Sequence, residues 1–384
     1  MAKKRKDSKG RVLKKGESQR KNGTYDYRYT TKKGKIVSVY AKTLEDLRQK
    51  ELLIERDILD GIDYNAGEQT VSELVDKYIN MKRKIKPNSI RAYSSPIKRI
   101  HADPFGRKRI RDIKKSDAQA WFIKLHDEGL KRNTISVFKT VLQPAFEMAV
   151  DDDIIRKNPF RFNISELLPD DQIKRPALTK SQQKKYLDFV RDYGSSNYYN
   201  DIVILLETGL RVSELYGLTL LDIDLIKRRL YVRRQLCRTA DKPYFVCPPK
   251  TENGIRTVPL SNVAYRAIKE VITNRGKPKV EIMVDGCSGF LFLDKNKRPK
   301  VAMHLENHMK MLRKKYNDLF GNTMPNVSPH VLRHTFCTNM QQAGLDPKSL
   351  QYIMGHGDPT ITLSLYTHSD YEFVEKAFRE ALGT

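Results

Sequence analysis

The stretch that most constrains this chain is residues 328–366, which read SPHVLRHTFCTNMQQAGLDPKSLQYIMGHGDPTITLSLY. His330 and Arg333 stand three residues apart, so on a helix their side chains leave the same face. An imidazole beside a guanidinium suits an anionic oxygen, and a phosphate is the obvious candidate. His356 follows a Met-Gly pair, and Tyr366 stands ten residues beyond it, where it could act as a nucleophile. The stretch therefore predicts a helical segment that handles a phosphate.

The charge of the chain is strongly unbalanced. Its 384 residues include 72 Lys and Arg against 46 Asp and Glu, which gives a net charge of +26 and a pI near 9.7. Such a balance favours a polyanionic partner, and nucleic acid fits better than a membrane. No run of about 18 apolar residues occurs that could cross a bilayer, and the basic N-terminus lacks the apolar centre of a signal peptide. The length predicts two or three domains.

The cysteines predict neither a disulfide framework nor a metal site. They are Cys237, Cys247, Cys287 and Cys337. No CxxC pair and no spacing typical of metal ligands occurs among them. We expect free thiols in a reducing cytosol, and hence a cytoplasmic protein.

The first domain is expected over residues 1–65. Residues 24–30 (TYDYRYT) alternate tyrosines with charged residues, which predicts a strand, and residues 35–40 (KIVSVY) predict a second one. Thr43 then begins a helix that ends at Gly61. This small basic sheet either presses basic and aromatic groups into a DNA groove or is a stable appendage, and the net charge favours DNA. The basic residues assigned to DNA binding here are Lys3, Lys4, Arg5, Lys6, Arg28, Lys32 and Lys33.

The second domain is expected over residues 70–165 and to be all-α. Apolar residues at helical spacing predict helices over residues 70–79, 88–100, 116–127 and 133–150. The turn signals DPFG and DEG separate them. This predicts a four-helix module with a basic face. The residues assigned to DNA binding on that face are Lys82, Arg83, Lys84 and Arg91.

The third domain is expected over residues 175–384, after a linker rich in proline and charge (LPDDQIKRP). It is predicted to be mainly helical with a smaller β part. Thr179 begins its first helix, and further helices are expected over residues 200–207, from Arg211, and over residues 264–273.

The β part of this domain is predicted from three apolar runs, residues 229–234, 244–249 and 255–260. Lys250 stands between the last two runs and is therefore expected near a hairpin tip. The run GFLFL, residues 289–293, predicts one more strand.

Four motifs of this third domain line up along the chain, namely ETGLRVSEL, PPKTENGIRTVPL, HVLRH and MGHGDPTITLSLY. Each contributes one or two polar residues: Arg211 with Glu214, then Lys250, His330 with Arg333, and His356 with Tyr366. Together the motifs resemble the signature of the tyrosine recombinases, also called the phage integrase family. Met354 stands where that family usually has Leu before Gly-His, and this apolar exchange should leave the chemistry intact.

The resemblance extends to the layout of the whole chain, which is similar to the integrases of Gram-positive conjugative transposons. The fold class expected is multidomain. It comprises a small basic β-sheet plus helix that binds arm-type DNA sites, an all-α four-helix core-binding domain, and a mainly α, mixed α+β catalytic domain. The function implied is a site-specific recombinase that cleaves and rejoins DNA through a covalent 3′-phosphotyrosine, and so integrates and excises a mobile element. The phosphotyrosine conserves the bond energy, so neither ATP nor a metal nor another cofactor is expected.

The roles of the motif residues follow from the charge of the reaction. The scissile phosphodiester gains negative charge in the transition state, and Arg211 and Arg333 would stabilise it from two sides. His330 and His356 would donate hydrogen bonds. Tyrosine has an ordinary pKa of about 10, so the nucleophile Tyr366 needs a base, and His330 is the residue that the resemblance favours.

Two further residues complete the set. The resemblance assigns to Lys250 the protonation of the leaving 5′ oxygen. Glu214 is expected on the same helix face as Arg211, where it would orient or support the site.

Simpler interpretations of these motifs exist. Arg211 and Glu214 could be a plain ion pair three residues apart on a helix. His330 and His334 have the spacing of zinc ligands. However, Val331 stands where HExxH has its Glu and no third ligand is evident.

Other histidine and aromatic residues are expected to be structural. His304 and His308 share the zinc-like spacing and are expected on an exposed helix face. Trp121 and Phe146 are expected in a core, and not as platforms on which bases stack.

Two tyrosines compete with Tyr366 for the role of nucleophile. Tyr352 lies before MGH, and Tyr371 lies too far after it. Beyond Tyr366, an apolar stripe over residues 373–382 predicts a tail helix, which docks either on its own domain or, as is common in this family, on a neighbouring protomer.

Two functions are compatible with these motifs. The first is the recombinase, working as a homotetramer on synapsed double-stranded DNA with core-type and arm-type sites. An excisionase or a host DNA-bending protein would be its accessory partner. The second is a DNA-binding architectural or regulatory protein with the same fold and no strand transfer, and a type IB topoisomerase-like activity is a rival within the first class. The complete set of six catalytic residues favours the recombinase.

Overall fold

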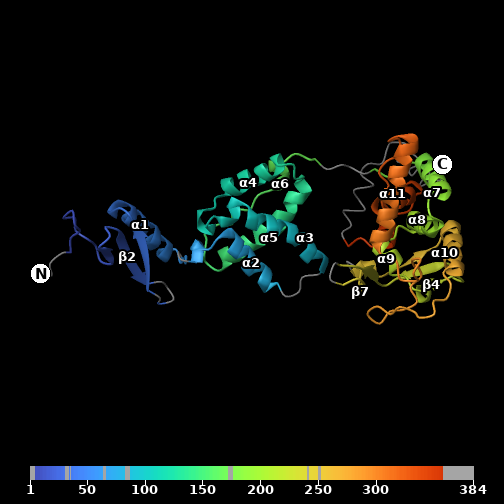
Figure 1. Cartoon of the computed structure of the whole chain (residues 1–384), viewed down its shortest axis with the longest axis horizontal. Coiled ribbons are helices and arrows are strands. Elements are labelled where there is room, and N and C mark those ends of the chain that lie inside the picture. Colours follow the sequence, from blue (N-terminus) through green and yellow to red (C-terminus); the bar gives the residue numbers. More distant parts are fainter. Residues whose placement is uncertain are drawn as a thin grey trace, which may run out of the picture. The chain divides into compact units, whose positions relative to one another are not determined.

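A computed structural model of the chain divides it into two compact units, Met1–Ile173 and Lys174–Thr384 (Figure 1). The described residues are 5–30, 34, 36–63, 66–82, 87–171, 176–239, 242–249 and 252–357, with the side chains of residues 87, 88 and 91 left out. The first unit contains separate hydrophobic cores for its sheet and for its helical bundle. The division into three domains at the expected boundaries stays a prediction. In the described part of the chain, no helix is long and apolar enough to cross a membrane.

The N-terminal part of the first unit is a three-stranded antiparallel sheet with one helix on it. Its elements are β1 (Glu17–Gln19), β2 (Tyr25–Thr30), β3 (Ile36–Ala41) and α1 (Leu44–Leu59). The two predicted strands and the helix are confirmed. The sequence analysis missed β1 because its three residues, ESQ, are all polar. Thr43 caps α1 by accepting a hydrogen bond from the Asp46 backbone N–H at 3.1 Å.

The tyrosines of β2 face inward. Tyr25 and Tyr29 are buried and pack in the two small cores that contain Leu47 and Ile54 of α1. The idea that the aromatic groups of this strand enter a DNA groove is therefore wrong for these two side chains, because α1 covers the face on which they stand. The predicted DNA contacts of the basic residues are unaffected by this burial.

Two buried carboxyl groups, Glu17 of β1 and Glu51 of α1, interact with each other. Glu17 of β1 is fully buried and accepts hydrogen bonds from the Arg48 guanidinium at 2.9 Å and from the Lys14 backbone N–H at 2.6 Å. Glu51 of α1 is also buried, and its Oε1 atom has no hydrogen-bond partner among the described residues. Burial, and then the negative charge of Glu17, raise the pKa of Glu51 to about 7.

This pair makes the stability of the sheet depend on pH. Because the folded pKa of Glu51 is raised, its favourable contribution is complete below the ordinary pKa of about 4.5 and is lost as the pH rises through 7. We expect the hydrogen-exchange protection of β2 amides to fall between pH 5 and pH 8 in the wild type and to stay level in Glu51→Gln. Intrinsic exchange rates are the same for both proteins at each pH, so they cancel. A parallel decline in both proteins would contradict the assignment.

The second part of the first unit is the predicted helical bundle. Its helices are α2 (Val71–Met81), α3 (Pro87–Ala102), α4 (Lys115–Asp127), α5 (Arg132–Asp151) and the short α6 (Ile164–Leu167), with 3-10 turns at Ala66–Glu68, Pro104–Arg107 and Ile110–Asp112. The four predicted helices agree with α2 to α5. Trp121 and Phe146 are buried, as expected, and Trp121 stacks on Phe105 with ring centroids 4.4 Å apart.

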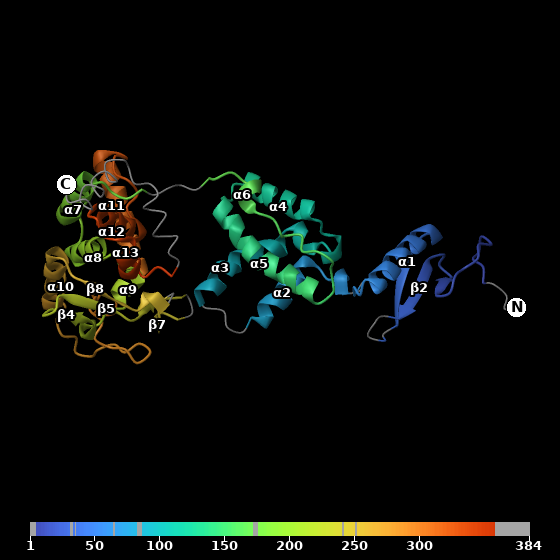
Figure 2. The same ribbon diagram turned by 180° about the vertical axis from the view of Figure 1, so that it is seen from behind.

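The second unit is built around one buried helix, α8. Helices α7, α10 and α12 pack against it, and its residues from Asp201 to Leu206 are all buried (Figure 2). The helices of the unit are α7 (Lys180–Tyr193), α8 (Ser196–Thr208), α9 (Val212–Tyr216), α10 (Asn262–Asn274), α11 (Ala302–Phe320), α12 (Pro329–Gln342) and α13 (Pro347–Met354), with 3-10 turns at Leu220–Asp222 and Glu252–Gly254.

The β part of this unit is a long hairpin in two sections. Its strands are β4 (Ile223–Asp224), β5 (Arg229–Val232), β6 (Gln235–Cys237), β7 (Phe245–Cys247) and β8 (Arg256–Pro259). One section pairs β6 with β7. The other section pairs β5 with β8, and β4 pairs with the other edge of β5.

The pairing of the strands bears on the reason given for the expected place of Lys250. Strands β7 and β8 do not pair with each other, so the two apolar runs on either side of Lys250 are not the two arms of one hairpin. Lys250 itself lies outside the described residues, and its place near a hairpin tip stays a prediction. Alternating apolar residues identified the strands but could not show which of them pair.

Two smaller expectations fail. The run GFLFL does not form a strand, because Phe290 and Leu293 make only isolated bridges, although Leu291 and Phe292 are buried like strand residues. His308 is not on an exposed face, because it is buried with its ring stacked on Tyr198 at 4.4 Å. In both cases the neighbours that bury the segment come from distant parts of the chain.

Candidate active site

A glycine turn places the first motif. Helix α8 ends at Gly209, whose φ of 63° is in the left-handed region that favours glycine. A Cβ atom there would lie 2.3 Å from Phe336 of α12, so the close approach of the two helices also requires glycine. The chain then turns directly into α9, with Arg211 at its N-cap position.

The side chains of three arginines surround the carboxylate of Glu214. We name Glu214, Arg211, Arg256 and Arg333 the Glu214 cluster. Glu214 Oε1 accepts a hydrogen bond from Arg211 at 2.7 Å, and Glu214 Oε2 accepts one from Arg256 at 2.9 Å. Arg333 approaches the same Oε2 at 4.0 Å. Burial alone would raise the pKa of Glu214, but the positive charges of Arg256 and Arg211 outweigh it, so the pKa lies below its ordinary value. The buried carboxylate is therefore ionised and partly balances the arginines.

Arg333 is fixed by two backbone carbonyls. Its guanidinium donates to the Gly209 carbonyl at 2.6 Å and to the Met354 carbonyl. These bonds join α12 to the end of α8 and to the end of α13. Burial, and then the charge of Arg211, lower the pKa of Arg333 to about 9. The group still carries its charge at neutral pH, because that value lies above 7.

His356 lies beside this cluster. Helix α13 ends at Gly355, which has a φ of 63°, and the next residue is His356. Arg211 donates a long hydrogen bond of 3.5 Å to the Gly355 carbonyl. Burial, and then the positive charges of Arg333 and Arg211, lower the pKa of His356 to about 4. Its imidazole is therefore neutral at pH 7 and can donate a hydrogen bond without carrying charge.

The three arginines differ in exposure. The side chain of Arg211 is 23% exposed, that of Arg333 is 7% exposed and that of Arg256 is 0% exposed. Arg211 is therefore the member of the Glu214 cluster that is best placed to meet a ligand, and Arg256 cannot meet one.

His330 stands one turn before Arg333 on α12, but its surroundings are different. It is exposed and lines a groove of about 600 Å³ between α11 and the start of α12, together with Lys310 and Arg313. Arg333 is instead directed to the carbonyls described above. The expectation that both side chains meet one phosphate stays a prediction.

Lys250 and Tyr366 lie outside the described residues. The structure thus brings together Arg211, Glu214, Arg333 and His356 of the predicted set and leaves those two untested. The zinc interpretation finds no support from His334, whose Nδ1 lies 3.3 Å from the Thr338 hydroxyl. Among the described residues no three potential metal-ligating side chains form a group.

Arg256 is the residue of this cluster that the sequence analysis did not assign. A usable signal was present, because in IRTVPL the alternation of a strand places Arg256 on the same side as Val258 and Leu260. Both of these apolar residues are buried. An arginine on a buried strand face needs a carboxylate partner, and that partner is Glu214.

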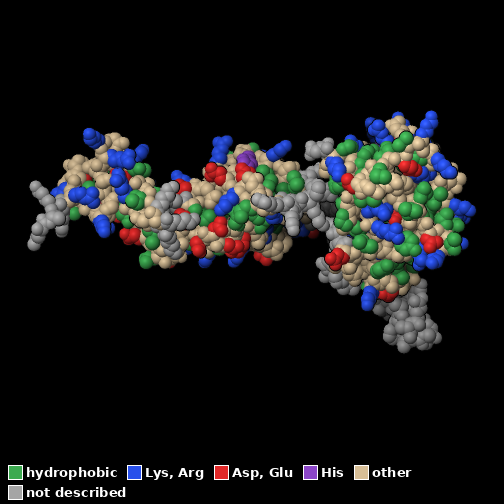
Figure 3. Space-filling model, turned by 90° about the horizontal axis from the view of Figure 1, so that it is seen from below, with side chains coloured by type: hydrophobic (Ala, Val, Ile, Leu, Met, Phe, Trp, Pro, Cys, Tyr) green, Lys and Arg blue, Asp and Glu red, His purple; other side chains and the backbone are tan. Residues whose placement is uncertain are grey.

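Few of the basic residues predicted to bind DNA can be placed. Those with described side chains are Arg5, Lys6, Arg28 and Lys82, and all four are exposed. Those outside the described residues are Lys3, Lys4, Lys32, Lys33, Arg83 and Lys84, together with the side chain of Arg91. Figure 3 shows Lys and Arg side chains spread over the visible face of both units.

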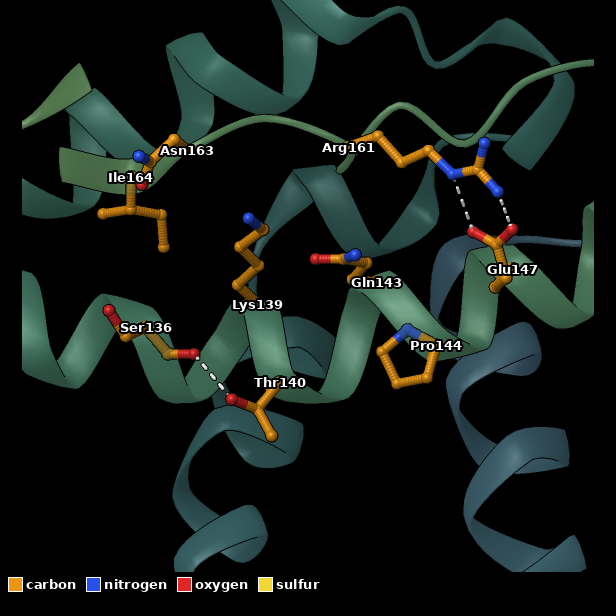
Figure 4. A pocket seen from close by; sticks show the side chains of 9 residues that line it. All are labelled: Ser136, Lys139, Thr140, Gln143, Pro144, Glu147, Arg161, Asn163 and Ile164. Carbon is orange, nitrogen blue, oxygen red and sulfur yellow. Dashed lines mark hydrogen bonds and ion pairs between the residues drawn. The ribbon is translucent and has the colours of Figure 1, made fainter. Parts of the chain in front are cut away.

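A groove on the helical bundle is a second candidate surface (Figure 4). Its volume is about 670 Å³, and it lies between α5 and the segment before α6. Its polar side chains on α5 recur at helical spacing, namely Ser136, Lys139, Thr140 and Gln143. Hydroxyl, amide and ammonium groups of this kind contact phosphates and base edges in protein–DNA complexes. Clusters of Lys and Arg in the sequence do not mark this face, because it contains mainly uncharged polar side chains.

An ion pair borders this groove. The guanidinium of Arg161 donates two hydrogen bonds to the carboxylate of Glu147. One runs from Nε to Oε2 at 3.1 Å, and the other runs from Nη2 to Oε1. Lys139 donates to the Phe162 carbonyl, and burial lowers the pKa of its ammonium group.

Comparisons with known proteins agree with this architecture. The model of the phage integrase family matches residues 176–372, that of the DNA binding domain of tn916 integrase matches residues 1–58, and that of the phage integrase N-terminal SAM-like domain matches residues 70–126.

Whole proteins of known identity are similar over almost the full length. The transposase from transposon Tn916 of Enterococcus faecalis and that from transposon Tn1545 of Streptococcus pneumoniae are each 40% identical to this chain, covering 97% of it and 95% of their own lengths. The solved structure of the Tn1549 transposon integrase in complex with a circular intermediate DNA is 38% identical, with a TM-score of 0.76 over 81% of this chain and 99% of that one. The chain therefore belongs to the phage integrase family, whose members are tyrosine-type site-specific recombinases.

Proposed function

We propose that this recombinase integrates and excises a mobile element by cutting DNA with Tyr366, and that Arg211, Arg333 and His356 hold the scissile phosphate. The Tyr366 hydroxyl attacks phosphorus, so that a bond from phosphorus to the tyrosine oxygen forms and the bond to the 5′ oxygen breaks. The proton of Tyr366 passes to His330, and the leaving 5′ oxygen takes a proton from Lys250. The free 5′ hydroxyl of another strand later reverses the step and rejoins the DNA.

The charges of the site support these roles. Negative charge builds up on the non-bridging oxygens of the phosphate, where fixed positive groups are most effective. Arg211 is partly exposed and can meet such an oxygen, while Arg333 is held by two carbonyls and needs no reorganisation. His356 is neutral, so it donates a hydrogen bond without repelling the arginines.

The observation that carries the proposal is the Glu214 cluster itself. Three guanidinium groups around one buried carboxylate leave a net positive site in a place from which water is largely excluded. Such a site favours an oxyanion far more than a surface arginine does. A protein that only binds DNA has no need for buried arginines, because phosphate contacts at its surface suffice.

The test is a trapping experiment with a suicide duplex. The duplex carries the end sequence of the element that encodes this chain, with a nick placed close to the expected cleavage site. After cleavage the short fragment diffuses away, religation fails, and we expect a covalent protein–DNA complex to accumulate on a denaturing gel. If the wild type binds the duplex but traps nothing, the chain is a DNA-binding regulator and the proposal fails.

We also propose separate DNA contacts for three domains within residues 1–65, 70–165 and 175–384. The small sheet would bind arm-type sites. The helical bundle, with its Lys82 and the groove on α5, would bind core-type sites beside the catalytic domain. Cleavage of two duplexes would take four copies of the chain on synapsed DNA. The solved Tn1549 integrase complexes with DNA and the matching Tn916 domain support this assignment.

Deleting residues 1–65 tests the division. We expect the shortened chain to lose its affinity for arm-type DNA and to keep its affinity for core-type DNA in gel shifts. Both affinities should fall steeply with salt, because each domain would neutralise several phosphates. Loss of both affinities on deletion would show that the domains do not bind independently.

A further inference from the structure

We propose that Arg256 is a positioning residue of the active site: it holds the stretch that follows Lys250 against Glu214 and against the end of α13, without touching DNA. This inference rests on the proposed roles of Lys250 and Tyr366.

Arg256 bonds to three separate segments of the second unit. Its Nε donates to the Ile353 carbonyl near the end of α13 at 2.5 Å. One terminal nitrogen donates to the Gly254 carbonyl at 2.9 Å, and the other donates to Glu214 Oε2 at 2.9 Å. A single planar group therefore joins the connection before β8, the end of α13 and helix α9.

Each of these segments is next to a residue with a proposed catalytic role. Gly254 is four residues beyond Lys250 in the sequence, Ile353 is three residues before His356, and Glu214 bonds directly to Arg211. Arg256 thus fixes the backbone near Gly254, which follows Lys250 in the chain, relative to Glu214 and to the end of α13.

The contact between two of these segments leaves no spare room. A Cβ atom on Gly355 would lie 3.0 Å from a terminal nitrogen of Arg256 and 3.1 Å from the Asn253 carbonyl oxygen. The backbone that follows Lys250 therefore lies directly against the turn that precedes His356. A change in the guanidinium would let these two segments shift relative to each other.

Burial excludes a direct role for Arg256. Its side chain is 0% exposed, as is that of Glu214, so it cannot reach DNA. An arginine suits this position because its rigid fork donates in three fixed directions, whereas the ammonium group of lysine is a point charge. Arg256→Lys therefore keeps the charge that faces Glu214 and loses the geometry.

The consequence for the reaction falls mainly on the leaving group. The 5′ oxygen departs as a poor leaving group unless it receives a proton, so a displaced Lys250 slows this step. Misplacement of a catalytic group by about 1 Å can cost on the order of 100-fold in rate. A sulfur atom in place of that bridging oxygen leaves as a thiolate, and thiols have pKa values near 8.5, so this substrate needs no general acid.

The experiment compares two nicked suicide duplexes, one with the natural 5′ oxygen and one with a 5′-bridging sulfur at the scissile phosphate. Rates of covalent complex formation are measured for the wild type, Arg256→Lys and Arg256→Met. We expect Arg256→Lys to be slowed on the order of 100-fold on the oxygen substrate and to come within about threefold of the wild type on the sulfur substrate. Arg256→Met should show the same selective rescue with lower overall rates, because the charge is also lost.

The ratio of the two rates separates positioning from stability. Partial unfolding or weaker DNA binding lowers both rates by one factor and leaves their ratio unchanged. Equal slowing on both substrates, or no slowing at all, overturns the proposal. If the wild type forms no covalent complex on either substrate, the proposed function itself fails, and this inference fails with it.

Arg229 supplies a matched control. It lies on β5, paired with Pro259 of the same sheet, and its partner Asp224 is 3.6 Å away in a partly exposed pair. Arg229→Lys makes the same chemical change on the strand that pairs with the strand of Arg256, at the opposite end of the pairing and outside the Glu214 cluster. We expect both rates of this variant to equal those of the wild type.

Discussion

Tyr366→Phe will abolish the covalent protein–DNA complex while leaving DNA binding intact. The substitution removes one oxygen atom, the atom that would attack phosphorus, and phenylalanine has no other group that could replace it. We expect the rate of complex formation on the nicked duplex to fall by at least on the order of 10⁴-fold. Gel shifts with the same duplex should be unchanged, because the aromatic ring remains.

The competing tyrosines provide the controls. Tyr352 is exposed on α13, and its hydroxyl accepts a hydrogen bond from the Thr257 backbone N–H at 3.2 Å. We expect Tyr352→Phe to lower the rate no more than a few-fold, in line with the loss of one exposed hydrogen bond. Tyr371→Phe should likewise trap DNA. A covalent complex that persists in Tyr366→Phe and maps by mass spectrometry to Tyr371 would move the nucleophile to that residue.

Glu214→Gln will strongly destabilise the second unit. The amide keeps the shape of the carboxylate but removes the negative charge that balances Arg211, Arg256 and Arg333 among the described residues. Breaking a buried ion pair in this way typically costs about 3–5 kcal/mol, because buried charges are left uncompensated. Calorimetry of the full chain should show the melting transition of this unit shifted well below that of the wild type.

The same substitution should change the dependence of stability on pH. The pKa of Glu214 is lowered on folding, so its contribution is present above the ordinary pKa of a glutamate and is lost as the pH falls through the folded value. The variant has no such group and should lack this acid-side loss. Asp188→Asn is the control, because Asp188 and Arg191 form an exposed pair at 3.3 Å, which is worth about 0–1 kcal/mol. Equal destabilisation by the two substitutions would contradict a central role for Glu214.

Sequence reasoning succeeded where the deciding interactions are local. Thr70 and Glu73 form a full capping box at the start of α2, and Thr179 and Gln182 form another at the start of α7. Each box joins residues three positions apart, so the sequence contains both partners side by side. The order of helices and strands was predictable for the same reason.

It failed where the deciding neighbour is distant in the chain. Alternation showed that Tyr25 and Tyr29 share one face of β2, but only α1 decided that this face is buried. The spacing of His304 and His308 placed both on one helix face, and only Tyr198 showed that His308 stacks inside the unit. Periodicity identifies a face and does not say what covers it.

The stretch 328–366 and its companion motifs indicated the family from the sequence alone, because the motif residues stand in the order that is typical of that family. Only the tertiary structure decided how they are held. Glu214 bonds to Arg256 across 42 positions of the chain, and Arg333 bonds to the Gly209 carbonyl across 124. No local pattern contains such distances. They are set by the folding of the second unit around α8, which buries the charges so deeply that each must find a partner.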